Sequence, residues 1–371
     1  MRSVGIHAAL LAVSLFLAYR AWTKAQTGET RAAVREEEED AQVVLFDIQP
    51  DAVLEVAFEG EKRRVKIAVT GRGEKRGFDV STYRRDERRR PRPRPDAGPR
   101  DGGPDAGVRD AAPSAPVDAG PEIEIVETNK RFSGNGDLAT WLGKVAPLRA
   151  KRSFGTVKPW LLREFELTTP RATITIRAGG RTHALKVGGA TFGSSDAYVM
   201  DGRTRKVYLV ASDLVRDLEF AETRFMQRDL VAADKKDIVK ATVSSGTKRR
   251  TLVQRQREQA NEASWRDEAH ADTPNELYDN WMGRLLRLRA LEYLEPGEEP
   301  HAEGISTPPE PVLSVEYFGE SGSLGKVEIV KLDTDPEAYY ARSDATRGWV
   351  EISGSLAEQV ARDVEAVLGG G

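Results

Sequence analysis

Side chains that could carry chemistry are few in this chain, and none of them forms a strong motif. The sequence holds four histidines and no cysteine, so thiolate metal sites, cysteine nucleophiles and disulfides are excluded. His270 stands between Asp267 and Asp272 in the run WRDEAHADTPNE, and imidazole with carboxylates can bind a metal ion. The same composition is typical of a solvated acidic loop, and we predict no metal site.

Two further patterns match catalytic or phosphate-binding motifs only in part. Ser245 and Lys248 have the spacing of a serine nucleophile and its lysine base, but Gly246 places them in a turn rather than on a helix. The glycine-rich segment Lys186–Tyr198 precedes a strand, whereas a phosphate-binding loop follows a strand and opens a helix. We therefore predict a hairpin turn there, no catalytic or cofactor-binding residue, no cofactor and no enzymatic activity.

The most strongly charged segment is RRDERRRPRPRP, which begins at Arg84. Its arginines could contact lipid phosphates or an anionic envelope polymer, or the segment could be a solvated spacer stiffened by proline. Nucleic acid is not an expected partner, because no aromatic residues for base stacking are interleaved with the arginines and the net charge of the chain is −3. The segment 84–120 lacks any apolar run, so we predict a disordered insert.

The N-terminus predicts a membrane anchor. From Val4 to Tyr19 the chain carries no formal charge. Trp22 suits the membrane interface, and Arg20 and Lys24 can extend to the head groups, so the effective length approaches the roughly 20 residues of a membrane span. We expect an uncleaved single-pass helix in residues 1–24, with a cleaved signal peptide or a soluble helix as alternatives.

An acidic linker, residues 25–41, follows the predicted anchor. Positive residues flank the anchor almost equally, so charge alone does not set its orientation. The lack of cysteine suits an oxidising compartment, where stray thiols would mispair. We expect the protein in the bacterial inner membrane, with the bulk of the chain in the periplasm.

The rest of the chain contains an internal repeat. WLGKVAPLRA, from Trp141, resembles WMGRLLRLRA, from Trp281. Upstream, EKRRVKIAV resembles TKRRTLVQR; downstream, AYVMDGRTRKVYLVASDL resembles AYYARSDATRGWVEISGSL. The downstream pair aligns Tyr198 with Tyr339 and Tyr208 with Trp349. Three matches in the same order indicate a tandem duplication with a period well beyond that of solenoid repeats.

Hydrophobic periodicity indicates the elements of each unit. Ala172–Ala178 and Val312–Phe318 alternate apolar and polar residues, as half-buried strands do, and the segments after them can return as hairpin partners. The two tryptophan segments have helical periodicity, with apolar faces that extend to Leu148 and Leu288. We expect Asp137 to cap the first helix, and Thr273, followed by Pro274, to cap the second.

These patterns predict an α+β fold. Two tandem related units, each a mainly antiparallel sheet with helices on one face, stand behind the single N-terminal transmembrane helix. The first unit spans 42–232 and the second 233–371. Far more residues separate Arg64 from the strand of Ile125 than separate Arg250 from the strand of Trp265. The insert 84–120 therefore lies inside the first unit, between strands that we expect to pair across it.

Residues 162–218 carry a resemblance to a known family. Pro170, Ile174, Ile176, Gly179, Leu185, Gly188, Tyr198, Val207 and Tyr208 match the pattern of the bacterial domain-of-unknown-function family 4340. A weaker version of the pattern occurs in the second unit, so the resemblance covers about 42–371 apart from the insert.

The resemblance to this family implies a membrane-anchored extracytoplasmic protein. Some members are similar to auxiliary components of ABC transport systems linked to gliding motility. From it we expect an accessory or scaffold protein, auxiliary to an ABC transport system or an envelope assembly. A transporter permease or envelope proteins would be its partners. The alternative is a ligand-binding module that uses the cleft between the two repeats.

Overall fold

The computed structural model describes residues 43–71, 73, 76–90, 122–256, 263–302 and 307–369. The predicted membrane anchor and acidic linker lie outside these residues. Within them, no helix has both the length and the apolar character that a membrane crossing needs. Most strands pair antiparallel in three sheets accompanied by a few helices, which confirms the α+β class.

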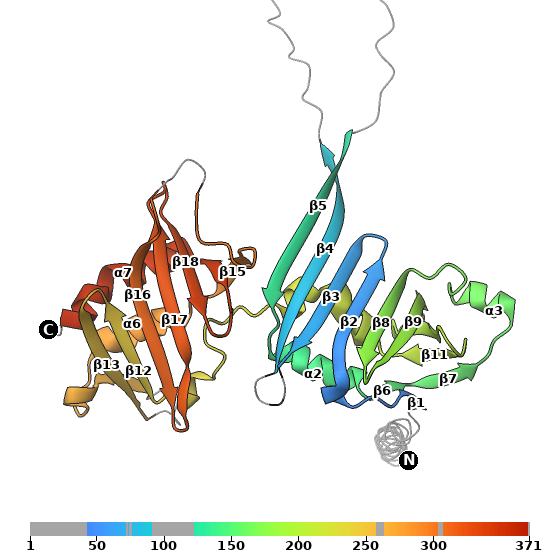
Figure 1. The fold of residues 1–371 in the computed structure, drawn as a ribbon, viewed down its shortest axis with the longest axis horizontal. Coiled ribbons are helices and arrows are strands. Elements are labelled where there is room, and N and C mark those ends of the chain that lie inside the picture. Colours follow the sequence, from blue (N-terminus) through green and yellow to red (C-terminus); the bar gives the residue numbers. More distant parts are fainter. Residues whose placement is uncertain are drawn as a thin grey trace, which may run out of the picture. The chain divides into compact units, whose positions relative to one another are not determined.

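The larger sheet has nine strands in the order β5-β4-β3-β2-β8-β9-β10-β11-β7 (Figure 1). A separate two-stranded sheet pairs β1 with β6. The strands are β1 (Val43–Phe46), β2 (Val53–Gly60), β3 (Arg63–Thr70), β4 (Gly77–Arg90), β5 (Glu122–Ser133), β6 (Leu148–Ala150), β7 (Arg152–Gly155), β8 (Ala172–Ala178), β9 (Arg181–Ala190), β10 (Ala197–Asp201) and β11 (Val207–Val210).

Helix α2 (Gly136–Val145) accompanies this sheet, together with the short helices α3 (Pro159–Glu164), α4 (Ser212–Glu219) and α5 (Ala221–Phe225). The apolar face of α2 is buried, with Trp141 only 2% exposed. Two details of the sequence prediction are wrong. Asn135 caps the helix by accepting from Leu138 N–H, and Leu148 lies on β6, because the helix ends before Pro147.

The smaller sheet has eight strands in the order β14-β13-β12-β16-β17-β18-β19-β15. Its strands are β12 (Lys240–Ser245), β13 (Lys248–Arg255), β14 (Ser264–Asp267), β15 (Ala290–Tyr293), β16 (Glu310–Gly319), β17 (Gly322–Leu332), β18 (Ala338–Ser343) and β19 (Trp349–Ile352).

Helices α6 (Glu276–Leu285) and α7 (Gly354–Gly369) lie behind this sheet in the view of Figure 1. Trp281 of α6 is fully buried, and its indole Nε1 donates to Val360 O of α7 at 2.9 Å. The cap again differs from the predicted one: Asn275, not Thr273, accepts from Leu277 N–H. Pro274 therefore precedes the cap, and Leu288 lies beyond the end of the helix.

The central strands of the two sheets follow the same order. β3-β2-β8-β9-β10-β11 in the larger sheet corresponds to β13-β12-β16-β17-β18-β19 in the smaller one. The turns before the last strand also match: Arg205 N–H donates to Asp201 O at 2.9 Å, and Arg347 N–H donates to Ser343 O at 2.8 Å. Both arginines have left-handed backbones, with φ of 57° and 58°. A duplicated unit predicts such agreement.

These turns correct the predicted alignment of the two copies by one residue. They make Val207 the counterpart of Trp349 and Tyr198 the counterpart of Tyr340, whereas the sequence comparison makes Tyr208 the counterpart of Trp349. Tyr208 pairs with Val199, while Trp349 pairs with Arg342 on the face away from the helices. A slip of one residue moves a side chain to the other face of a sheet, so the matched aromatic residues are not equivalent.

The arginine-rich segment begins inside a strand rather than in a disordered insert. β4 continues to Arg90, so the predicted start of the insert at Arg84 lies inside this strand. Both faces of an extended hairpin can be solvated, so a charged sequence does not prevent strand pairing there. β4 and β5 are neighbours, as predicted for strands on either side of the insert. Residues 91–121 lie outside the described residues.

β5 also has a different role from the one expected. The sequence comparison equates the strand of Ile125 with the strand of Trp265. In the sheets, however, β14 lies next to β13 and β4 lies next to β3. β4 is therefore the spatial counterpart of β14, and β5 is an additional edge strand.

A short segment covers the outer face of β10 and β11 in the larger sheet. Phe165 stacks on Tyr198, with ring centroids 4.0 Å apart, and Leu167 packs with Met200 and Val207. Gly188 of β9 lies under this segment, where a Cβ atom would come within 2.1 Å of the main-chain oxygen of Phe165. Only glycine permits that approach.

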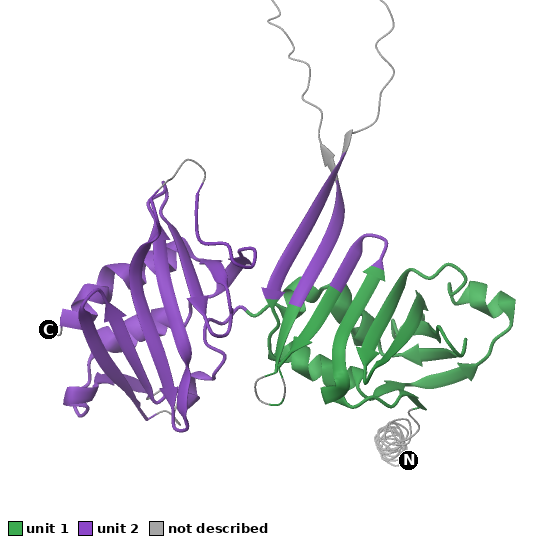
Figure 2. Cartoon of the chain, in the orientation of Figure 1, with its two compact units in different colours: residues 1–59, 66–79, 133–227 green, residues 60–65, 80–132, 228–371 purple. Residues whose placement is uncertain are grey.

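The chain divides into two compact units (Figure 2). The first comprises 1–59, 66–79 and 133–227, and the second comprises 60–65, 80–132 and 228–371. This division groups the β4–β5 hairpin with the second unit, although its strands belong to the nine-stranded sheet. The predicted domain boundaries at 42–232 and 233–371 stay a prediction.

Candidate functional site

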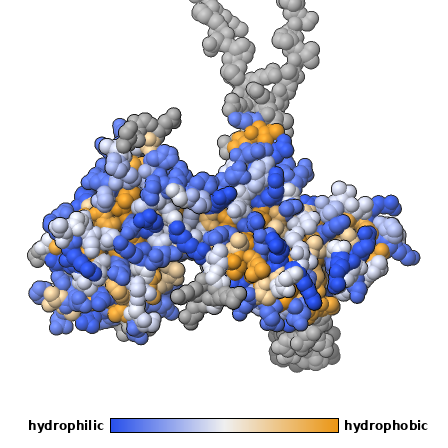
Figure 3. All heavy atoms as spheres, in the orientation of Figure 1, coloured by the Kyte–Doolittle hydropathy of each residue, from blue (hydrophilic) through white to orange (hydrophobic). Residues whose placement is uncertain are grey.

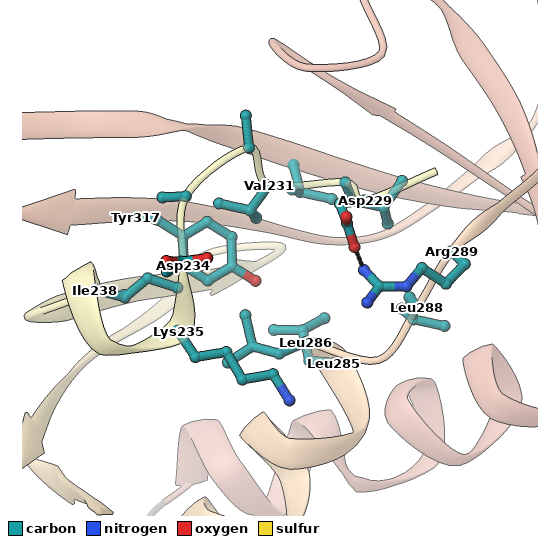
Figure 4. A pocket seen from close by; sticks show the side chains of 14 residues that line it. Asp229, Val231, Asp234, Lys235, Ile238, Leu285, Leu286, Leu288, Arg289 and Tyr317 are labelled. Carbon is teal, nitrogen blue, oxygen red and sulfur yellow. Dashed lines mark ion pairs between the residues drawn. The ribbon is translucent and has the colours of Figure 1, made fainter. Parts of the chain in front are cut away.

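A cavity of about 290 Å³ opens beside the eight-stranded sheet (Figure 4). Three parts of the second unit form it: the segment 229–238, the end of α6 with the residues that follow it, and the middle of β16 and β17. Its volume lies near the lower limit for small-molecule sites, which are about 300–1,000 Å³. The cavity is therefore large enough for a small ligand.

The segment that leads into β12 forms one wall of the cavity. Asp229 makes a β-bridge and an ion pair with Arg289 at the start of this segment. Leu230 and Ile238 then anchor it in the core, at 6% and 1% exposure. The residues between these anchors include the 3-10 turn Lys235–Asp237, which carries the chain over the cavity.

Tyr317 supplies the main polar group inside the cavity. It lies on β16 and is 1% exposed, and burial raises the pKa of its hydroxyl far above the ordinary value. The hydroxyl is thus a neutral hydrogen-bond donor at physiological pH. In Figure 4 it points from the back of the cavity toward the side of Leu286 and Leu288. Within the described residues it makes no hydrogen bond.

The nine-stranded sheet has a strand at the corresponding place. β1 pairs Val44 with Arg149, at the position where Asp229 bridges Arg289 in the second unit, and Phe46 follows a bulge in β1 and lies opposite Leu148. Phe46 is 8% exposed and its ring lies 4.4 Å from that of His183.

Two neighbouring positions also differ between the two large sheets. The strand registers equate Ile176, opposite His183, with Tyr317, opposite Gly325. The second sheet thus carries a tyrosine where the first carries an isoleucine. A Cβ atom at Gly325 would lie nearest Asp344, at 3.1 Å from its Oδ2, so this glycine does not enlarge the cavity.

The ionisable residues that line the cavity balance one another. Asp229 forms an ion pair with Arg289. The other two ionisable lining residues, Asp234 and Lys235, are exposed at the mouth of the cavity. Leucine and valine side chains form the inner wall, with Leu285, Leu288 and Val327 all 3% exposed or less. The cavity therefore offers a ligand polar groups at its mouth and only little apolar surface inside.

The sequence motifs considered for catalysis have structural partners. Ser245 Oγ donates to Val312 O at 2.7 Å, and Lys248 forms an ion pair with Glu365 of α7. Gly246 between them has φ 55°, so the pair lies in the predicted turn. Both side chains are thus used to fix the β12–β13 hairpin against its neighbours.

The glycine-rich segment after Lys186 forms a hairpin turn, as predicted, between β9 and β10. Asp196 organises this turn: it is 5% exposed, accepts from Ser194 Oγ at 2.9 Å and pairs with Lys151 at 3.0 Å. Gly193 has φ 89°. The loop meets a strand rather than a helix, so it lacks the dipole and free N–H groups of a phosphate loop.

The residues considered as metal ligands are not gathered. Asp267 forms an ion pair with Arg250 and accepts from Ala269 N–H, so its oxygens are engaged. In the described part of the chain, no group of three or more histidine, aspartate or glutamate side chains could hold a metal ion. Of the arginine-rich run, Arg84 pairs with Asp86 at 2.8 Å on β4.

The face of the eight-stranded sheet away from the helices carries a charged ladder. Glu328 accepts from Lys326 and Arg342, each at 2.7 Å, and Arg342 lies 4.7 Å from the ring of Trp349. These two basic groups lower the pKa of Glu328. Figure 3 views this side, where hydrophilic residues surround smaller hydrophobic areas. The ladder makes this face of the eight-stranded sheet hydrophilic. The corresponding face of the nine-stranded sheet is covered by the segment that carries Phe165 and Leu167.

Sequence reasoning did not single out the residues of this cavity. Tyr317 sits at an inward position of VLSVEYF, where it has the appearance of an ordinary core aromatic residue. The available signal was the comparison of the two copies, in which Ile176 aligns with Tyr317.

The described part of the chain is thus an α+β protein built on antiparallel sheets, with a ligand-sized cavity beside the second large sheet. Residues 134–308 match the model of the family described as Domain of unknown function (DUF4340), which confirms the family predicted from the sequence. The match begins just before α2 and ends just before β16, so it is narrower than the expected 42–371. No curated protein and no solved structure matches the chain.

Proposed function

We propose that this chain is a binding protein rather than an enzyme, and that the cavity beside β16 is its ligand site. The observation that supports this most directly is the cavity itself, about 290 Å³ in volume, with Tyr317 of β16 in its lining. Concave sites of about this size are where proteins commonly bind small molecules.

The rest of the proposal concerns where the binding takes place. Residues 1–24 would tether the protein to the bacterial inner membrane, and the two tandem repeats would stand in the periplasm behind the acidic linker. This placement rests on the apolar N-terminal run and the lack of cysteine. The sequence alternative, a ligand cleft between the two repeats, stays a prediction, because the cavity lies within the second one.

A cavity-filling variant tests the proposal. Val231→Phe enlarges a half-buried side chain of the cavity lining and should abolish binding of small-molecule probes. It should also raise the unfolding free energy, because it buries added apolar surface at about 25 cal/mol per Å². Val312→Phe, at a half-buried position of β16 outside the cavity lining, serves as the matched control. The proposal fails if Val231→Phe leaves probe binding unchanged while the protein stays folded.

A second proposal follows from the family resemblance: the protein is an accessory to an ABC transport system or another envelope assembly. Mild crosslinking of the native protein in its membrane should then recover an integral-membrane partner such as a permease. Recovery of a free monomer at native expression would contradict it. The two proposals are compatible, since a transporter accessory can present a ligand.

A further inference from the structure

The first unit has a basic groove beside the point where the described chain begins. The groove has a volume of about 310 Å³ and is lined by the end of α2, by β6 and by the residues that join β11 to α4. Its charged lining residues are Lys144, Arg149, Lys151 and Asp213, so basic side chains outnumber acidic ones. The groove belongs to the first unit, whereas the cavity beside β16 belongs to the second.

The positive charge of this region is only partly neutralised. The two lysines of the groove form ion pairs with Asp213 and Asp196, at 2.7 and 3.0 Å. Arg149 and Arg152 are both exposed, and neither has an ion pair with a carboxylate of the described residues. These two guanidinium groups can therefore bind carboxylates of another segment.

The pairing of β1 with β6 directs the N-terminal part of the chain to these arginines. Val43, the first described residue, lies opposite Ala150, the residue after Arg149. Because the strands are antiparallel, the chain before Val43 runs toward the residues that follow Ala150, which are Lys151 and Arg152. The N-terminal part of the chain thus enters the fold at the edge of the groove.

The chain directly before this point of entry is strongly acidic. Residues 36–40 read EEEED, which places Asp40 three residues and Glu36 seven residues before Val43. At about 3.3–3.6 Å per residue, such lengths of chain span at most about 10–25 Å. The carboxylates are therefore tethered within reach of the groove, and a short tether gives an effective concentration in about the millimolar range.

We propose that the acidic run 36–40 docks on the basic groove, where its carboxylates pair with Arg149 and Arg152. The charge complementarity and the point at which the chain enters the fold both favour this occupant. An anionic membrane fits less well, because the acidic run beside the groove would repel lipid phosphates. Docking would leave residues 25–35 as the spacer between the predicted membrane anchor and the first unit, and would hold that unit closer to the membrane.

Pulsed electron paramagnetic resonance on the full-length protein tests the docking, because the chain has no native cysteine and accepts spin labels at chosen positions. One label is attached at Ala33→Cys, before the acidic run, and one at Ala139→Cys, which is exposed on α2. In neutral detergent micelles at low salt, we expect a narrow distribution of the distance between the labels. The distribution should broaden at least about twofold in 1 M NaCl, where the Debye length falls to about 3 Å.

Charge exchange identifies the residues that hold the run. Arg149→Glu with Arg152→Glu should broaden the distribution at low salt, and replacing residues 36–40 with lysine in that variant should make it narrow again. Arg181→Glu with Lys186→Glu changes the charge equally at exposed positions of β9 outside the groove lining. This matched control should leave the distribution narrow. Circular dichroism shows whether each variant is folded.

Substitution by glutamine keeps the test informative if the glutamate variant unfolds. Arg149→Gln with Arg152→Gln removes the two charges without reversing them and should also broaden the distribution. A broad distribution for the wild type at low salt overturns the proposal, and so does a distribution that stays narrow in the folded arginine variants. If these variants instead lose affinity for vesicles that contain phosphatidylglycerol, while the distance between the labels is unchanged, the groove binds an anionic membrane and the proposal fails.

Discussion

Replacing Gly188 with alanine should destabilise the first unit strongly, although the change adds one methyl group. The added Cβ would lie 2.1 Å from Phe165 O and 3.0 Å from the side chain of Leu167. The first of these neighbours is main chain and cannot rotate away. The segment that carries Phe165 must therefore move off β9.

The magnitude follows from what that movement breaks. Gly189 N–H donates to Phe165 O at 2.9 Å, and the loss of this bond costs about 0.5–1.5 kcal/mol. Forcing a methyl group into a filled site adds about 1–3 kcal/mol. The stacking of Phe165 on Tyr198 lies directly over this site and would be disturbed too. We expect the unfolding free energy to fall by about 2–4 kcal/mol.

Urea unfolding followed by circular dichroism measures the effect, with Gly143→Ala as the control. Gly143 is exposed on α2, and a Cβ there would have no atom within 4 Å. Alanine at that position should stabilise the helix by about 0.5–1 kcal/mol. If Gly188→Ala costs less than about 1 kcal/mol, the close approach of Phe165 is not the reason that position 188 requires glycine.

Three other predictions concern other parts of the chain. Trp281→Phe should cost more than Trp141→Phe by about 1 kcal/mol in urea unfolding, because only the Trp281 indole of these two has a hydrogen-bond partner, Val360 O, within the described residues. Equal costs would contradict this. Hydrogen bonds from the two basic residues of the ladder lower the pKa of Glu328. The ionised carboxylate therefore contributes stability at pH values above its ordinary pKa of 4.5, and this stability is lost as the pH falls through the lower pKa of the folded state. Glu328→Gln should therefore flatten the fall in unfolding free energy below about pH 4.5, and an unchanged slope would refute the assignment. Deleting 91–121 and joining the strands by a two-residue turn should leave the circular dichroism spectrum of the folded units intact; unfolding would mean that β4 and β5 do not hold each other without the segment.

The strands and their pairing were largely predictable from the sequence, because they depend on local alternation. The hairpin of Ala172–Ala178 with the strand after it has the expected partner, and so does that of Val312–Phe318. The repeat also placed the insert between neighbouring strands. Both helix caps were missed by two residues; at the first helix, Asn135 competes with Asp137 for a role that either side chain can fill.

The candidate site was beyond sequence reasoning for a physical reason. A cavity is the space left by residues far apart in the chain, and here its lining comes from the segment 229–238, the end of α6 and the strands β16 and β17. No residue among them is unusual by itself. The alignment of the copies also slipped by one residue near Trp349, and a slip of one residue exchanges the two faces of a strand.

The β4–β5 hairpin has a practical consequence. β4 ends at Arg90, β5 begins at Glu122, and the two strands are neighbours in the sheet, so the sheet itself brings the two chain ends of this junction together. A foreign domain whose own termini lie close together can be spliced in at this junction without changing strand register. A fluorescent reporter inserted there would travel with the protein while both of its termini remained free.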